Sequence, residues 1–194
     1  PADNEGARGP VAEAEAATRE KVIRAQPGPQ EMALCSTADI MFLGGQAGGG
    51  KSFLLLLAII QNANEPFFFA EIFRRTYPEL TMTGGLWPES FRLFPHIGGI
   101  PREGLLGWRF PSGAKIKFSH MQHPQDRLNW KGAQIPMLGF DQVESFTGEM
   151  FWYMVSRNRD PSGRVRPWII ASCNPVPADD PVGGWLHQLI AWWI

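Results

Sequence analysis

The chain has 194 residues and a formal net charge of -1 at pH 7; 44% of its residues are hydrophobic and 19% are charged. This length suits one well-cored domain and is too short for two large ones. The composition excludes disordered and fibrous classes. The near-neutral charge excludes a strongly basic nucleic-acid-binding protein, so any DNA contact must come from a local patch or from several subunits together.

The N-terminal residues 1–29 are expected to form an arm and a helix outside the main domain, which we place at residues 30–194. Residues 1–10 read as a flexible arm. Residues 11–25 are Ala-rich, with Glu15 and Arg19 at helical spacing, so a short exposed helix is predicted there, ended by the sequence QPGPQ.

A strand, a glycine loop and a helix are predicted next. The apolar segment 39–43 predicts the strand, 44–50 the loop, and 51–62 a helix that is apolar nearly all round and therefore buried. The continuous apolar run at 66–73 is typical of a central strand in a parallel sheet. The apolar run FLLLLAII at 53–60, within the predicted helix, is too short to span a membrane.

The second half alternates strands and helices. A hairpin is predicted over 105–120, turned at the sequence PSGA, followed by a strand at 136–141 and a helix at 147–158. A buried strand at 166–174 and a final helix from 184 complete the pattern. We therefore predict an α/β fold with a mainly parallel central sheet, flanked by helices and carrying an inserted hairpin.

The sequence GQAGGGKS satisfies the G-x-x-x-x-G-K-[ST] pattern, and it lies between a predicted strand and a predicted helix, as a phosphate-binding loop (P-loop, Walker A) must. Backbone N–H groups of such a loop surround phosphate oxygens, the lysine reaches the β and γ phosphates, and the serine hydroxyl binds Mg²⁺. The predicted ATP-binding residues are Gly45, Gln46, Ala47, Gly48, Gly49, Gly50, Lys51 and Ser52.

The P-loop alone leaves several functions open. A guanine-reading N-K-x-D sequence is absent, which disfavours a GTPase. The basic segment 156–166 could imitate the lid of a small-molecule kinase, although a solvated helix end explains the same residue types. Two cysteines without a CxxC pair favour neither a disulfide framework nor a zinc site, and they indicate a reducing, intracellular setting.

Three further residues complete a predicted ATPase site of the ASCE (RecA-like) kind. Asp141 ends an apolar strand, so it is the candidate Mg²⁺ ligand beside Ser52. Asn174 ends the next strand and is the candidate sensor of the γ-phosphate, although without the other motifs an Asn-Pro turn would be the preferred explanation. Gln30 precedes the P-loop strand, where its amide could read the adenine edge.

The residue after Asp141 is Gln142, where many ATPases place a catalytic glutamate. Glutamine can orient a water molecule but cannot accept its proton at neutral pH. Two hypotheses follow: Gln142 is a natural or engineered brake on hydrolysis, or Glu144 acts in its place. We favour the first, because Glu144 lies beyond the predicted strand end.

Taken together, these motifs resemble the ATPase domain of the large terminase subunit of tailed bacteriophages. The resemblance is carried, in order, by GGQAGGGKS, FRRTYPEL, GAKIKFSHMQHPQDRLNWKGAQI, MLGFDQVESF, FWYMVSRNR and ASCNP. It implies an ATP hydrolase that uses Mg²⁺ to drive double-stranded DNA into a procapsid in the host cell cytoplasm, without a membrane. The alternatives are a P-loop small-molecule kinase and an ATP-binding assembly module with little hydrolysis.

The resemblance also implies partners and a domain layout. A homo-oligomeric, pentameric ring would work with a portal protein and a small terminase subunit, and an isolated domain could still be a monomer. A C-terminal nuclease domain is expected to follow Ile194 in the full-length protein, so this chain should not cut DNA.

Carried over by position, Gln30 matches the adenine-reading glutamine, Lys51 and Ser52 the Walker A pair, Asp141 the Walker B aspartate, and the segment 172–174 the coupling motif. Many relatives carry a basic residue inside the Walker A loop, which this chain lacks. The charge that stabilises the transferring phosphoryl group must come from elsewhere, in cis or from an adjacent subunit. The candidates are Arg127, Lys131, Arg157 and Arg159, whereas Arg74 and Arg75 would position nucleotide or DNA.

Overall fold

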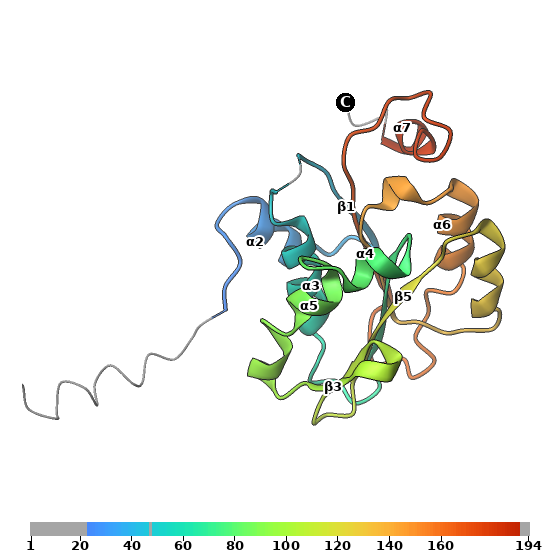
Figure 1. Cartoon of the computed structure of the whole chain (residues 1–194). Coiled ribbons are helices and arrows are strands. Elements are labelled where there is room, and N and C mark those ends of the chain that lie inside the picture. Colours follow the sequence, from blue (N-terminus) through green and yellow to red (C-terminus); the bar gives the residue numbers. More distant parts are fainter. Residues whose placement is uncertain (1–22, 47, 191–194) are drawn as a thin grey trace, which may run out of the picture.

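A seven-stranded sheet with helices on both faces forms the centre of the computed structural model, which describes residues 23–46 and 48–190 (Figure 1). The strands are β1 (Ile40–Leu43), β2 (Phe69–Arg74), β3 (Ile100–Arg102), β4 (Gly107–Arg109), β5 (Lys115–His120), β6 (Met137–Phe140) and β7 (Trp168–Ser172). Their order is β1-β7-β6-β2-β5-β4-β3. The first five in this order are parallel, and β4 and β3 add an antiparallel end. The predicted fold class is confirmed.

Short helices connect the strands. The α-helices are α2 (Pro29–Leu34), α3 (Lys51–Ile60), α4 (Tyr77–Thr81), α5 (Leu86–Ser90), α6 (Gly148–Val155) and α7 (Trp185–Ile190). The 3-10 helices are η2 (Phe94–Ile97), η3 (Glu103–Leu105), η4 (Pro124–Trp130) and η5 (Val143–Ser145). None of the helices within the described ranges is long and apolar enough to cross a membrane.

Successive side chains of each strand point to opposite faces of the sheet, so the hydrophobic core has two layers. On one face, Ile72 and Ile116 pack with the buried stretch of α3 and with an aromatic group around Trp108, whose indole N–H donates to Ser90 Oγ at 2.9 Å. On the other face, Phe73 and Phe140 stack at 5.5 Å and pack against α6. Because adjacent residues of a strand point to opposite faces, continuous apolar runs are what a doubly covered sheet requires.

Six of the seven strands, all except β3, and the helices α3, α6 and α7 lie where the sequence predicts them. The predicted helix at 147–158 ends earlier, at Val155. Residues 11–22 of the predicted N-terminal helix lie outside the described residues, and residues 23–25 are not helical, so the prediction is wrong for that end. Residues 191–194, the end of the predicted last helix, also lie outside them.

Among the helices that were not predicted, α2 has a clear physical explanation. The sequence QPGPQ was expected to act only as a stop, yet α2 begins at Pro29. Proline suits the first helical position, because its missing N–H would have no intrahelical partner there and its fixed φ fits the helix. Gly28, at φ 95°, allows the chain to turn into the helix.

Candidate functional site

The glycine loop joins β1 to the first turn of α3 at the carboxyl end of the sheet. Gly48 and Gly50 have φ angles of 83° and 72°, in the left-handed region that glycine adopts without strain. A Cβ atom at Gly50 would also lie 2.8 Å from Gln30 Nε2. The Lys51 ammonium group donates to the carbonyl oxygens of Gly45 and Gln46, each at 2.7 Å. The loop thus holds its own lysine at the start of α3. Ala47 lies outside the described residues.

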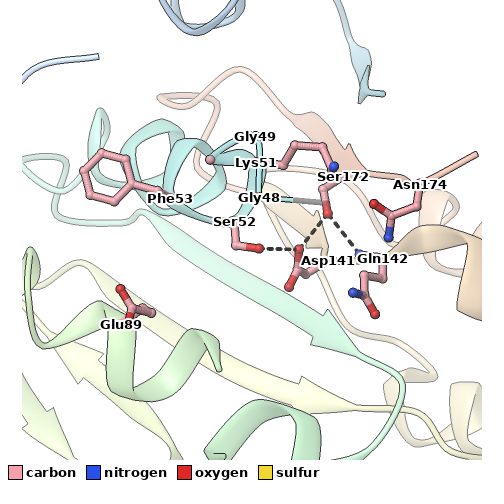
Figure 2. Close-up of a pocket in the computed structure, with 11 residues that line it drawn as sticks. Gly48, Gly49, Lys51, Ser52, Phe53, Glu89, Asp141, Gln142, Ser172 and Asn174 are labelled. Atoms are coloured by element: carbon pink, nitrogen blue, oxygen red, sulfur yellow. Dashed lines mark hydrogen bonds between the residues drawn. The ribbon is translucent and has the colours of Figure 1, made fainter. Parts of the chain in front are cut away.

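Asp141 is the centre of a buried hydrogen-bond network. Its side chain follows β6, and only 3% of the residue is exposed. Oδ1 accepts hydrogen bonds from Ser52 Oγ at 3.0 Å and from Ser172 Oγ at 2.6 Å (Figure 2). Oδ2 lies 3.0 Å from Arg74 Nη1. Residues from α3, β7 and β2 therefore hold both carboxylate oxygens in place.

A pocket with a volume of about 320 Å³ lies next to this network. It lies at the carboxyl ends of the parallel strands β1, β6 and β7, which is where ligands bind in open α/β sheets. Figure 2 shows the Lys51, Ser172 and Asn174 side chains near Asp141 and Gln142, with Glu89 set apart on α5. The lining residues are Gly48, Gly49, Gly50, Lys51, Ser52, Phe53, Glu89, Asp141, Gln142, Ser172 and Asn174.

Gln142 lines the pocket from a strained backbone position. Its φ of 58° and ψ of 62° lie in the left-handed region, which is uncommon for a residue with a side chain. Its backbone N–H donates to Ser172 Oγ at 3.0 Å, so one serine ties Gln142 and Asp141 together. Strained backbone of this kind concentrates at functional sites.

Glu144 faces Asn174 and is not among the residues that line the pocket. Asn174 Nδ2 donates to Glu144 Oε1 at 2.7 Å. Glu144 Oε2 is buried and has no hydrogen-bond partner within the described part of the chain. Gly183 packs against this residue, since a Cβ atom there would lie 2.6 Å from the Glu144 carbonyl oxygen. The Glu144 carboxylate thus lies behind Asn174, whose side chain binds it and also lines the pocket.

Cys173 directly follows β7 and lies between Ser172 and Asn174 in the chain. Burial raises the pKa of its thiol, and the negative charge of Glu144 raises that pKa further, while the Lys51 ammonium group opposes the shift. A raised pKa leaves less thiolate at a given pH, so this cysteine should be a weak nucleophile.

Gln30 lies beside the loop, and its amide is engaged with the chain. Only 6% of the residue is exposed. Its Oε1 accepts from the Gln26 backbone N–H at 2.8 Å, and its Nε2 lies 3.5 Å from the Gly50 carbonyl oxygen. Arg75 points elsewhere, with Nη1 2.8 Å from the sulfur of Met150 on α6.

Four predicted basic residues lie outside the pocket lining. Arg127 forms an ion pair with Glu149, and its guanidinium lies 5.7 Å from the centre of the Tyr153 ring. Arg157 lies 5.2 Å from the same ring.

Lys131 is exposed at the end of η4, and Arg159 donates to the Ala133 carbonyl oxygen at 3.5 Å. All four residues therefore belong to the surface around η4 and α6 and not to the pocket of their own chain.

The contacts of Arg74 and Ser172 with Asp141 were not predicted from the sequence. Arg74 is the last residue of β2, and β2 pairs with β6 so that Phe73 lies beside Phe140. The next residues, Arg74 and Asp141, are therefore neighbours at the same sheet edge. The strand pairing would have indicated this contact, but pairing is not readable from a single sequence.

Ser52 and Asp141 together fit a magnesium ion. Mg²⁺ prefers oxygen ligands and commonly uses one or two carboxylates with substrate phosphates and waters. The Ser52 hydroxyl and the Asp141 carboxylate are 3.0 Å apart at the pocket. Within residues 23–46 and 48–190, no group of three or more His, Cys, Asp or Glu side chains could hold a metal ion.

Comparisons with known proteins support the fold. No protein-family model matches the chain, and no curated protein matches it in sequence. Among solved structures, it is similar to the large terminase of bacteriophage HK97, with a TM-score of 0.63 and 10% sequence identity over 88% of this chain. The match covers 38% of that terminase. The expected resemblance is confirmed at the level of fold: this chain is folded like part of a bacteriophage large terminase.

Proposed function

We propose that the chain is the ATPase motor domain of a viral large terminase, coupling ATP hydrolysis to the translocation of double-stranded DNA into a procapsid. The observation that carries the proposal is the meeting of Lys51, Ser52, Asp141 and Asn174 at one pocket, in a chain folded like a large terminase. Lys51 and Ser52 begin α3, whereas Asp141 and Asn174 follow β6 and β7, so chance proximity is a weak explanation.

Several residues at the pocket and beside it would have roles in binding or hydrolysis. The glycine loop and the N-terminus of α3 would bind the phosphates of ATP, with Lys51 on the β and γ phosphates. Ser52 and Asp141 would hold Mg²⁺, which neutralises phosphate charge when bound. Asn174 would contact the γ-phosphate side of the pocket, and Gln30 would read the adenine from beside the loop.

Gln142 would orient the attacking water without removing its proton. Its position in the pocket and its fixed backbone support this role. Glu144 is a weaker candidate for the base, because Asn174 holds its carboxylate behind the pocket.

The phosphoryl-stabilising arginine would act between subunits. Arg127, Lys131, Arg157 and Arg159 contact the η4 and α6 region instead of their own pocket, which supports a role in trans within a ring. The expected assembly is a pentameric ring that works with a portal protein and a small terminase subunit in the host cytoplasm. Residues 30–194 would form its ATPase domain, with a nuclease domain in the full-length protein.

An ATP-binding assembly module with little hydrolysis is the second candidate, because Gln142 stands where a base is needed. A small-molecule kinase has less support: Arg157 and Arg159, from its predicted lid, contact Tyr153 and Ala133 and do not line the pocket.

Phosphate release from Mg²⁺ and ATP, measured with and without DNA, separates these functions. A motor domain should release phosphate at a rate that DNA changes. Nucleotide binding without release would support the assembly module, and transfer to a sugar or nucleoside in place of water would contradict the motor.

A further inference from the structure

Four cations share one face at the antiparallel end of the sheet. Arg109 on β4 lies directly opposite Lys115 on β5, and Gly107 lies between Arg102 on β3 and Lys117 on β5. Residues that are paired in this way point to the same side of a sheet. The intervening residues of β4 and β5 point to the opposite side, where they are buried in the aromatic core. We call Arg102, Arg109, Lys115 and Lys117 the basic face.

The basic face is exposed, and few acidic side chains pair with its cations. All four residues are exposed, and the Lys117 side chain keeps 46% of its accessible surface. Lys117 pairs with the buried Glu71 at 3.3 Å. For the other three cations, no salt bridge occurs with any residue that the structure describes. Three positive charges are therefore left without a partner in this part of the molecule.

A shallow groove of about 410 Å³ runs over the basic face. It includes all four cations together with apolar surface from Phe69 and Leu105, and its lining contains no acidic residue. The nearest acid along the chain, Glu103, lies in the turn between β3 and β4. The adjoining groove contains Asp126, whose carboxylate accepts a hydrogen bond from the His123 backbone N–H.

The placement of Arg109 opposite Lys115 works against stability, because like charges directly across two strands repel. A sheet surface selected only for solubility intersperses charges of both signs. In a chain with a net charge of -1, this local concentration of positive charge suits a polyanionic partner.

We propose that the basic face binds the phosphate backbone of double-stranded DNA. Three neighbouring strands span about 10 Å, and two residues along a strand span about 7 Å. A duplex carries one negative charge per about 1.7 Å of its axis, so about six phosphates lie along a 10 Å length. Four cations on a surface of that size match a short stretch of backbone, without base reading.

The choice of DNA over an acidic protein surface rests on the proposed function. The face itself is independent of the nucleotide pocket: it lies on the strands farthest from β1 in the sheet, at the hairpin in the lower part of Figure 1. Variants of the basic face should therefore leave hydrolysis measured without DNA unchanged.

The test compares two charge-matched double variants. The first is Arg109→Gln with Lys115→Gln. The control is Arg24→Gln with Arg166→Gln, which also removes two exposed cations; Arg166 pairs with Asp39 next to β1, at the opposite edge of the sheet. Binding of a short fluorescent duplex is followed by anisotropy between about 50 and 200 mM salt.

With four phosphate contacts, the affinity of the unmodified chain should fall about 150-fold across this salt range, because the logarithmic slope is about -0.9 per contact. The Arg109 and Lys115 variant should bind more weakly at low salt and lose only about 12-fold, and the control should behave like the unmodified chain.

Several results would overturn the proposal: no duplex binding at low salt, an unchanged slope in the first variant, or an equal loss in the control. Competition by polyglutamate as effective as that by DNA of equal charge would assign the face to an acidic protein instead. Phosphate release without DNA is measured on the same samples. If no phosphate is released while DNA binding is intact, the motor function is contradicted but the DNA-binding role of the basic face is not.

Discussion

Replacing Gln142 with glutamate tests the role assigned to the pocket most directly. The two side chains have nearly the same shape, and the backbone of Gln142 is held by its N–H bond to Ser172 Oγ at 3.0 Å, so the pocket geometry should persist. The new carboxylate could accept a proton from a water molecule in the pocket. General base catalysis supplies about two to four decades in rate, or about 3–5 kcal/mol of barrier. Steady-state phosphate release should show this gain in kcat, with KM for ATP changed little.

The matched control is Glu144→Gln, which removes a carboxylate next to Asn174 and adds none to the pocket. We expect it to lower kcat only modestly. No gain from Gln142→Glu, together with loss of activity in Glu144→Gln, would refute the reasoning and assign the base to Glu144. The thermal midpoint of both variants should be measured, so that a folding defect is not mistaken for a catalytic one.

Three other predictions concern the same network. Arg74→Met should lower the free energy of unfolding by about 3 kcal/mol, because it leaves a buried Asp141 charge without its cation; Mg²⁺ should raise the thermal midpoint of this variant more than that of the unmodified chain. Ser172→Ala should cost about 1–3 kcal/mol in urea unfolding, because Asp141 loses a donor and the Gln142 N–H loses its acceptor; a change below about 0.5 kcal/mol would argue against the network. Iodoacetamide should modify Cys173 more slowly than the exposed Cys35 at about pH 8, because burial and Glu144 raise the pKa of Cys173 and leave it protonated; peptide mass spectrometry showing equal rates would contradict this.

The sheet could be predicted because its strands carry strong local signals. The apolar runs around Phe42, Phe73 and Phe140 have no alternation, and a sheet covered on both faces imposes that pattern. The helix at Pro29 was missed because the same residue types, proline and glycine, both stop helices and begin them.

The candidate site could be predicted where a residue ends a strand or follows a glycine loop, as Asp141, Asn174 and Lys51 do. The roles of these residues remain predictions. The contact between Arg74 and Asp141 was not predictable, because it depends on β2 lying beside β6, which is a long-range pairing. The hydrogen bond from Asn174 to Glu144 depends in the same way on how two loops meet.

The order of the strands places the candidate nucleotide pocket and the basic face at opposite ends of one sheet. The pocket lies at β1, β7 and β6, and the basic face lies on β5, β4 and β3. Six strand spacings separate the two edges by up to about 29 Å. Over this width, a rigid 5° rotation about the β1 edge would move the β3 edge by about 2.5 Å. With ATP in the candidate pocket, a sub-ångström adjustment there would correspond to a displacement at the basic face comparable to the spacing between charges along a DNA duplex.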